Sequence, residues 1–218
     1  MRILITGANG LVGQGVLREC LRHADVAAVA ALGRRPSGHA HAKLSEITCE
    51  DFADLSTVED ALLPFDACFY CAGAPPLGTA EDEYRHVTLD LTLNVATTLA
   101  GLNPGIVFVY ISGAHSNPAS RLMPLRIKGE TEEALAALPI RTVMLRPGGI
   151  QPVEGVRSPH AAMAAVHSLA GPLLGLGVRL LPGALTTTGR VGRAMLAVLS
   201  QQPLPAVVEN AEINRLGA

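Results

Sequence analysis

The stretch ITGANGLVG, residues 5–13, decides the fold, because three regularly spaced glycines join a short apolar strand to a helix. Gly7 permits a sharp turn, Gly10 lets the backbone approach a phosphate group, and Gly13 lets the helix pack closely on a sheet. The positive end of that helix favours anions. In this strand–helix context the spacing predicts a dinucleotide-binding loop, with a tight turn that binds nothing as the alternative. The predicted cofactor-binding residues here are Gly7, Asn9, Gly10, Leu11, Val12 and Gly13.

The next strand predicts which dinucleotide binds. It ends in ALGRRP, so that Arg34 and Arg35 stand where an acidic residue would bind the ribose 2′-hydroxyl of NAD. Arginine pairs in a bidentate way with phosphate, so the sequence favours NADP(H) over NAD(H). Two solvated surface arginines are the alternative.

Two further short stretches extend the predicted cofactor site. Asp51 and Phe52 follow the third expected strand, where a carboxylate can accept the adenine amino group. Cys71, Ala72 and Gly73 end the fourth strand, at the carboxyl edge where cofactors lie in such sheets.

Apolar runs alternate with helix-like stretches along the whole chain, which predicts a doubly wound parallel α/β sheet of the Rossmann type, with helices on both faces. We expect strands over 2–6, 25–32, 43–48, 66–71, 105–112 and 140–145. We expect helices over 11–21, 56–63, 80–100, 124–138, from 187 or 188 onward, and in the final NAEINRLGA. Without a linker or an internal repeat, residues 1–218 are expected to form one domain.

Two of these expected helices carry more detailed predictions. Ser56 and Glu59 have capping-box spacing at the start of the short helix over 56–63. The periodicity of the long helix over 80–100 places five side chains on one face, namely Tyr84, Val87, Leu91, Val95 and Thr98.

The bulk composition excludes several classes of protein. Hydrophobic residues make up 49% of the 218 residues and charged residues 17%, which is typical of a globular chain. The formal net charge is −2 and the cations are scattered, so nucleic acid is not an expected partner.

Four cysteines are expected to be reduced core residues of a cytoplasmic protein. Cys68 and Cys71 have CxxC spacing, but they stand three residues apart on an expected strand and therefore point to opposite faces. A zinc or redox site is not predicted, and we expect no metal.

An apolar segment, residues 151–185, follows the sixth expected strand. Residues 161–178 contain no Asp, Glu, Lys or Arg, which raises the question of a membrane span, but four Gly and Pro residues interrupt them. We expect a cover for a substrate pocket or a subunit interface, and thus a homo-oligomer, in place of membrane association. Because ILITG follows Met1 and Arg2 directly, no signal peptide is expected.

These stretches together resemble the short-chain dehydrogenase/reductase superfamily, in its extended or atypical, NAD-dependent epimerase/dehydratase-like branch. The resemblance covers residues 1–152 and is closest to the small single-domain atypical reductases. The matching motifs, in order, are TGANGLVG, DF at Asp51, CAG, SGA, KGETE after Lys128, and RPGGIQ.

The resemblance implies roles for particular residues. Ser112 matches the serine that hydrogen-bonds the substrate carbonyl group. Lys128 matches the lysine that holds the nicotinamide ribose and lowers the pKa of a catalytic tyrosine. Arg146 and its successors match a loop near the nicotinamide, in which Pro147, Gly148 and Gly149 are the predicted cofactor-binding residues.

Two departures from the family pattern bear on activity. Pro124 occupies the position of the catalytic tyrosine, four residues before Lys128, and Thr88 falls where a helper asparagine is expected. Proline has no proton to donate, and loss of a general acid typically lowers the rate by about 10²- to 10⁴-fold. At Pro124 a helix start is expected, since proline is tolerated in a helix's first turn.

Another residue could supply the proton. His115 follows Ser112 by three residues, and the ordinary pKa of histidine suits proton transfer. A surface histidine without a role is the alternative, and Arg121, Tyr84 and Tyr110 are weaker candidates.

Two hypotheses remain open. The chain is either an NADP(H)-dependent oxidoreductase or epimerase-like enzyme acting on a small apolar substrate through Ser112, Lys128 and His115, or a non-catalytic NADP(H)-binding sensor or protein-interaction module. The retained lysine supports cofactor binding more than it supports catalysis.

Overall fold

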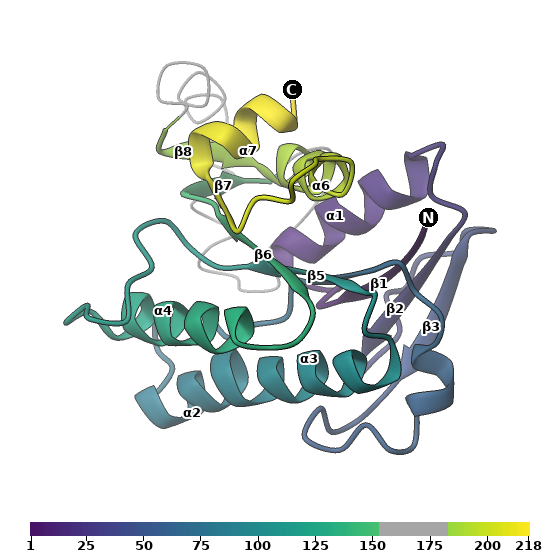
Figure 1. The fold of residues 1–218 in the computed structure, drawn as a ribbon, viewed down its shortest axis with the longest axis horizontal. Helices are drawn as coiled ribbons and strands as arrows, with labels where there is room; N and C mark the ends of the chain where they lie inside the picture. Colours follow the sequence, from purple (N-terminus) through teal and green to yellow (C-terminus); the bar gives the residue numbers. More distant parts are fainter. Residues whose placement is uncertain (153–182) are drawn as a thin grey trace.

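A computed structural model describes residues 1–152 and 183–218 of the chain. Within them, seven parallel strands form one sheet in the order β3-β2-β1-β4-β5-β6-β9 (Figure 1). The strands are β1 (Arg2–Thr6), β2 (Ala28–Gly33), β3 (Leu44–Thr48), β4 (Ala67–Tyr70), β5 (Val107–Ile111), β6 (Arg141–Arg146) and β9 (Val207–Glu209). The strand order reverses between β1 and β4, the point at which doubly wound sheets bind their ligands.

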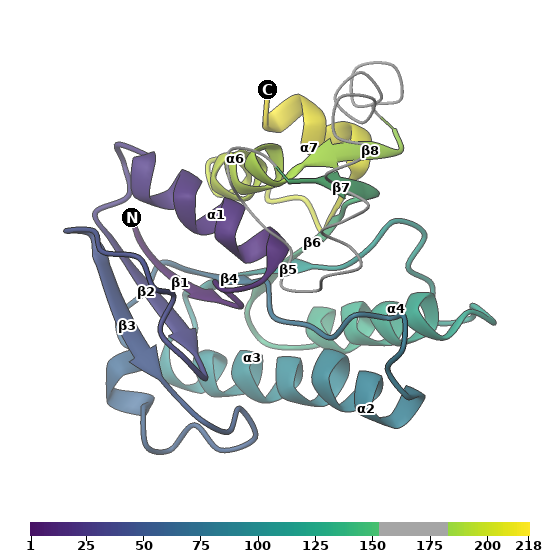
Figure 2. The same ribbon diagram turned by 180° about the vertical axis from the view of Figure 1, so that it is seen from behind.

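Helices cover both faces of this sheet (Figures 1 and 2). One face carries α1 (Leu11–Arg22), α6 (Thr188–Val198) and α7 (Asn210–Leu216). The other carries the 3₁₀ turn η1 (Glu59–Leu62), α2 (Glu81–Arg85), the π-helical η2 (His86–Asp90), α3 (Leu91–Leu102) and α4 (Met123–Ala136). The predicted doubly wound Rossmann-type fold is therefore confirmed.

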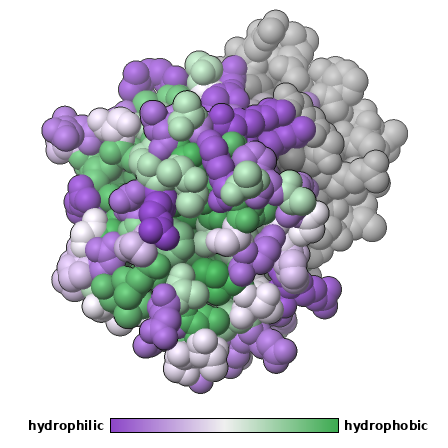
Figure 3. Space-filling model, turned by 90° about the vertical axis from the view of Figure 1, so that its right-hand side faces the viewer, coloured by the Kyte–Doolittle hydropathy of each residue, from purple (hydrophilic) through white to green (hydrophobic). Residues whose placement is uncertain are grey.

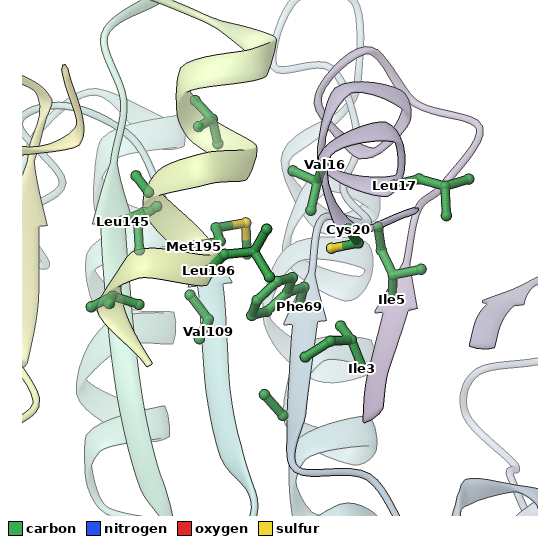
Figure 4. Close-up of a cluster of buried hydrophobic side chains, with 14 of the residues drawn as sticks. Ile3, Ile5, Val16, Leu17, Cys20, Phe69, Val109, Leu145, Met195 and Leu196 are labelled. Carbon is green, nitrogen blue, oxygen red and sulfur yellow. The ribbon is translucent and has the colours of Figure 1, made fainter. Parts of the chain in front are cut away.

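A hydrophobic core lies on each side of the sheet, which explains why the central strands are apolar without alternation. Figure 4 shows the core under α1 and α6, where Val16, Cys20 and Met195 meet strand residues such as Ile5 and Phe69. Complete burial of one such side chain contributes about 1.5–3 kcal/mol to folding.

The opposite core contains stacked aromatic rings. The ring centroid of Tyr70 lies 5.6 Å from that of Phe108 and 6.2 Å from that of Tyr110. Tyr70 belongs to β4, and Phe108 and Tyr110 belong to β5, so these rings pack across neighbouring strands under helices α3 and α4.

One of the two edges of the sheet is strand β3, and the other is β9. Ser45, Glu46 and Thr48 are exposed on β3, and polar edge residues of this kind discourage pairing with another chain. The side of the molecule that includes this edge mixes hydrophilic and hydrophobic side chains (Figure 3).

Most predicted strands agree with the structure to within three residues. Strand β2 begins at Ala28 and not at residue 25, because its register pairs Ala28 with Arg2, where β1 itself begins. Three strands were not predicted: β9, and the pair β7 (Gly149–Gln151) and β8 (Leu185–Thr187), which form a small parallel sheet of their own. Each has only three residues, too few to show a periodicity.

The predicted capped helix over 56–63 is wrong. Only the 3₁₀ turn η1 forms, it has no side-chain cap, and its N-cap residue is Val58. The Ser56 N–H donates to Asp54 Oδ1 at 3.0 Å, so Ser56 belongs to an aspartate turn and does not start a helix.

The predicted long helix is present, but a π-helical turn interrupts it. Segments α2, η2 and α3 follow one another without a gap from Glu81 to Leu102. The wider turn rotates the buried face, so that Thr88 and Thr92 are buried where Val87 and Leu91 were expected. Tyr84 and Val95 are buried as predicted.

The two CxxC cysteines contact opposite cores, as predicted. Cys68 packs in the core under α3 and α4, whereas Cys71 packs against the core under α1 and α6. All four cysteines are free thiols, and burial raises the pKa of each of this pair.

The apolar segment lies almost entirely outside the described residues, so the predictions for residues 161–178 and for a pocket cover have no structural counterpart here. Among residues 1–152 and 183–218, no helix has the length and apolar character needed to cross a bilayer.

Candidate functional site

The glycine loop joins β1 to α1 at the carboxyl edge of the sheet. Gly7 has a φ of +67°, and a Cβ atom there would lie 2.6 Å from backbone atoms of Cys71 and Ala72. At Gly13 a Cβ atom would lie 2.0 Å from the carbonyl oxygen of Gly7. The structure therefore requires glycine at both positions, for the turn and for the close approach of the helix.

The first turn of α1 is available to an anion. Its N-cap residue, Gly10, offers no side-chain cap, and the turn contains no acidic residue. The N–H groups of Leu11, Val12 and Gly13 stand at the positive end of the helix, where they have no acceptor within the helix itself. This geometry fits the pyrophosphate of a dinucleotide.

The end of strand β4 lies directly beside this loop. Thr6 Oγ1, which is buried, accepts hydrogen bonds from the N–H groups of Cys71 at 3.2 Å and Ala72 at 3.3 Å. A Cβ atom on Gly73 would meet no atom within 4 Å, so packing within the described chain does not require glycine there. Cys71, Ala72 and Gly73 stay predicted cofactor-binding residues beside the glycine loop.

Asn9 connects the glycine loop to residues 34–36, which follow β2 and are called the arginine turn below. Its side-chain amide donates to the carbonyl oxygens of Arg35 and Pro36, each at 3.2 Å. Arg34 and Arg35 are exposed, and their guanidinium groups form no ion pair with any described residue. Both arginines therefore lie beside the glycine loop, and their guanidinium groups are exposed.

Asp51 and Phe52 lie in the loop after β3. Asp51 Oδ1 accepts the N–H of Ala53 at 2.8 Å, which uses one carboxylate oxygen in a local turn. The carbonyl oxygen of Phe52 accepts a hydrogen bond from the side-chain amide of Asn94 at 2.7 Å, which anchors this loop to α3.

Ser112 is buried at the end of β5 and pairs with Ser116. Their hydroxyl oxygens lie 2.9 Å apart, and Ser116 Oγ also donates to the carbonyl oxygen of Gly113 at 2.8 Å. Each hydroxyl group has one proton, so Ser112 must donate to Ser116. In this arrangement Ser112 offers a ligand only lone pairs, and it can donate to a carbonyl group only if its hydroxyl group rotates and gives up the hydrogen bond to Ser116.

Lys128 extends from α4 towards the same strand end. Its ammonium group donates to the carbonyl oxygens of Ile111 at 3.1 Å and Ser112 at 2.8 Å, and lies 5.6 Å from the Tyr110 ring centroid. Burial lowers the pKa of Lys128 to about 8, although the negative charge of Glu132 opposes the shift. Among the described contacts one ammonium proton is left, which can serve a ribose hydroxyl group.

Pro124 lies in the first turn of α4, as predicted, and the helix begins one residue earlier, at Met123. The two tyrosines considered as substitute donors, Tyr84 and Tyr110, are each 1% exposed. Burial raises the pKa of both, so they are poor proton donors to a bound ligand. Thr88 lies in η2, and its buried hydroxyl group has no partner among the described residues.

His115 is exposed and has a left-handed φ of +64°, a conformation that histidine adopts more often than most residues. No hydrogen bond or ion pair links its side chain to a described residue, so nothing there orients it as a base. Its loop is fixed at the next strand, because the Ala114 N–H donates to the carbonyl oxygen of Pro147 at 2.9 Å. Arg121 is likewise exposed.

The loop after β6 is held from several sides. Arg146 does not point into the site: it forms a two-point ion pair with Glu132 and a further pair with Glu209 at 3.0 Å. The Gly148 N–H donates to Asn210 Oδ1 at 2.8 Å. Sequence reasoning placed Glu132 only as a charge near the helix start and did not predict the contacts of Glu132, Asn210 or Ser116, because their partners are far along the chain or belong to an irregular loop.

The sequence profile of the NAD dependent epimerase/dehydratase family matches residues 3–141. The chain belongs to this family. The match spans the glycine loop, the arginine turn, Ser112 and Lys128, so the predicted resemblance to epimerase-like short-chain dehydrogenases/reductases is confirmed, together with an NAD(P)-binding fold.

Curated proteins similar to this chain include two from Aspergillus species. Protein fmp52-1, mitochondrial, of Aspergillus oryzae is 32% identical over 77% of this chain and 72% of its own length. Protein fmp52, mitochondrial, of Aspergillus fumigatus is 33% identical over 78% of this chain and 74% of its own length. These names contradict the expected cytoplasmic location. The error arose because reduced cysteines indicate a reducing compartment without saying which one.

Solved epimerases share the fold. UDP-glucose 4-epimerase of Thermus thermophilus, in complex with NAD, matches with a TM-score of 0.70 and 20% identity over 99% of this chain and 81% of its own. UDP-glucuronic acid 4-epimerase of Bacillus cereus, in complex with NAD, has a TM-score of 0.69 and 17% identity over 95% and 76% of the two chains. At this identity the likeness establishes the fold alone.

Proposed function

We propose that this family member binds NADP(H) at the carboxyl edge of β1, β2 and β4, and that cofactor binding with little turnover is its main property. The observation that carries the proposal is the contact of Asn9 with the arginine turn. It places Arg34 and Arg35 next to the anion-binding end of α1, where the adenosine ribose of a dinucleotide would lie.

The arginine turn supports NADP(H) over NAD(H) on physical grounds. A 2′-phosphate adds negative charge that a guanidinium group can grip with two parallel hydrogen bonds. Strand β2 ends at Gly33 and is followed by Arg34 and Arg35, without a carboxylate to bind a 2′-hydroxyl group. The solved epimerases named above hold NAD, so the arginine turn is the feature expected to set this chain apart.

Three features support slow turnover. Pro124 has no proton to donate, the Ser112 proton is directed to Ser116, and the nearby tyrosines are buried. Lys128 keeps a proton for a ribose hydroxyl group, which strengthens binding without needing a reaction.

A second candidate is an oxidoreductase or epimerase-like enzyme for a small apolar substrate, and the Ser112–Lys128 arrangement favours it. Bound NADP(H) would supply or accept the hydride. Lys128, with a pKa of about 8, can exchange a proton near neutral pH, and Ser112 can accept a hydrogen bond from a substrate hydroxyl group. In this second candidate, His115 stays a proposed proton donor. The first candidate, a binding protein, would act through a protein partner or a second copy of the chain.

Calorimetric titration with NADPH and NADH tests the cofactor preference. We expect NADPH to bind at least about tenfold more tightly, since one charge-assisted hydrogen bond is worth roughly 1.5–3 kcal/mol. A double change, Arg34→Ala and Arg35→Ala, should remove the preference while leaving NADH affinity unchanged. Equal affinities in the wild-type protein would refute the proposal.

Turnover is followed separately, as NADPH oxidation at 340 nm with a panel of aldehydes, ketones and quinones. No turnover together with tight binding supports the first candidate. Turnover that disappears in the Ser112→Ala variant supports the second.

A further inference from the structure

The C-terminal helix α7 carries two buried asparagines, Asn210 and Asn214, which are 3% and 6% exposed. The helix lies against β7 and β8, beside the end of β6, in both ribbon views (Figures 1 and 2). Buried amide groups are retained where they hold other polar groups in place. The two asparagines differ in the groups that they hold.

Asn210 bridges two segments. Its Oδ1 atom accepts the N–H of Gly148 at 2.8 Å, and its Nδ2 atom donates to the carbonyl oxygen of Leu185 at 3.0 Å. One side chain thus fixes the glycine loop after β6 and the start of β8 at the same time.

Asn214 shares one of these contacts. Its Nδ2 atom donates to the same Leu185 carbonyl oxygen at 2.7 Å, and its Oδ1 atom accepts from Thr186 Oγ1 at 2.8 Å. Within the described part of the chain, the Gly148 N–H is bound by Asn210 and not by Asn214. Asn210, unlike Asn214, therefore holds the loop after β6 through the Gly148 N–H.

The loop that Asn210 grips has little freedom elsewhere. A Cβ atom on Gly148 would lie 2.1 Å from the carbonyl oxygen of Ala184, and the Gly149 N–H donates to that same oxygen at 2.8 Å. The backbone after Arg146 is therefore packed against the residues before β8, and the hydrogen bond from the Gly148 N–H to Asn210 connects it to α7.

We infer that Asn210 is a positioning residue, which holds the backbone of Pro147–Gly149 in the orientation needed at the nicotinamide end of the cofactor. This inference rests on the proposed NADP(H) binding. It assigns the C-terminal helix a part in the cofactor site, although that helix lies at the far end of the sequence from the glycine loop.

The test compares two ligands, NADPH and 2′-phospho-ADP-ribose, which lacks the nicotinamide. Asn210→Ala should weaken NADPH binding roughly three- to tenfold more than it weakens 2′-phospho-ADP-ribose binding. Asn214→Ala loses the contacts of Asn214 with Leu185, Thr186 and Arg190 but leaves the Gly148–Asn210 hydrogen bond in place, so both ligands should be affected equally. Hydrogen exchange of the Gly148 amide should accelerate in Asn210→Ala and stay unchanged in Asn214→Ala.

The aspartate pair, Asn210→Asp and Asn214→Asp, covers the case in which an alanine variant does not fold. Asn210→Asp keeps an acceptor for Gly148 but cannot donate to Leu185, so the ratio of the two affinities should stay within about twofold of the wild-type ratio. A ratio of the two affinities in Asn210→Asp that is about threefold or more below the wild-type ratio overturns the inference. An equal loss for both ligands in Asn210→Ala also overturns it. If the wild-type protein binds neither ligand, both the proposed function and this inference are overturned. If the wild-type protein binds both ligands tightly and Asn210→Ala has the same ratio of affinities, this inference alone is overturned.

Discussion

Lys128 connects the buried strand end to the proposed cofactor, and its charge sets a pH dependence. Burial lowers its pKa to about 8, so the ammonium form is the main form at pH 7 and the minor form at pH 9. Only the ammonium form can donate charge-assisted hydrogen bonds to a ribose hydroxyl group while it also holds the carbonyl oxygens of Ile111 and Ser112.

We predict that NADPH affinity decreases by up to about tenfold between pH 7 and pH 9, because the protonated fraction of a group with this pKa decreases by that factor. Affinity decreases as the pH rises because the free protein loses the Lys128 ammonium proton that is needed to bind the cofactor. Titrations at several pH values measure it, with Lys128→Met as the control, whose affinity should be lower and nearly independent of pH. A wild-type affinity that is constant across this range would contradict the role given to Lys128.

The ion pair between Glu132 and Arg146 gives a second prediction at this scale. Glu132 is 7% exposed, and hydrogen bonding to it raises the pKa of Arg146 above its usual value. Without Glu132, the Arg146 guanidinium group keeps only the exposed carboxylate of Glu209 as an ion-pair partner and loses its buried one, so Glu132→Ala should lower the free energy of unfolding by about 2–4 kcal/mol. Urea denaturation measures the change. The neighbouring Glu133 is exposed, and Glu133→Ala should change stability by less than about 0.5 kcal/mol.

At the scale of elements, two glycines in helices respond differently to the same substitution. A Cβ atom at Gly13, in α1, would lie 2.0 Å from the Gly7 carbonyl oxygen, whereas at Gly101, in α3, it would meet no atom within 4 Å. Gly13→Ala should therefore cost at least about 2 kcal/mol of stability. Gly101→Ala should add up to about 1 kcal/mol, because alanine favours the helix. Thermal unfolding of both variants checks the pair, and a stable Gly13→Ala protein would show that α1 can move away from the loop.

The elements that sequence could predict are those whose cause is local. Residues 107–110 form a strand because each is largely apolar and buried, and the loop at Gly7 turns because glycine allows it. The π-helical turn η2 was not predictable, since nothing in its five residues differs from an ordinary helix. Asn210 was also missed, because its partners, Gly148 and Leu185, are 62 and 25 residues away in the chain.

Some residues of the candidate site could be predicted from sequence in the same way, and others could not. Gly7, Gly13, Arg34 and Arg35 were placed together from sequence, because parallel strands bring their carboxyl ends to one edge. Lys128 was added to this site only through the family resemblance. The Ser112–Ser116 pair could not be anticipated, since it depends on how a loop without regular structure folds back on its own strand.

At the scale of the whole molecule, the C-terminal segment 207–218 completes both the sheet and the core. Strand β9 pairs with β6, and Val208 and Ile213 are at most 1% exposed. The Arg193 guanidinium group donates to the carbonyl oxygen of Gly217 at 2.9 Å through Nε, so the end of α7 is anchored on α6. Loss of this segment would expose the outer edge of β6 and the α7-facing side of α6.

Deletion of residues 207–218 should therefore abolish cooperative folding. Burial of Val208 and Ile213 alone contributes about 3–6 kcal/mol, against a total stability of roughly 5–15 kcal/mol for a typical domain. The bonds of Glu209, Asn210 and Asn214 would be lost as well. Circular dichroism during heating measures the effect, and deletion of the exposed Ala218 alone is the control, which should unfold like the intact chain. A shortened chain that unfolds cooperatively at the same temperature would mean that the segment only covers a domain that is stable without it.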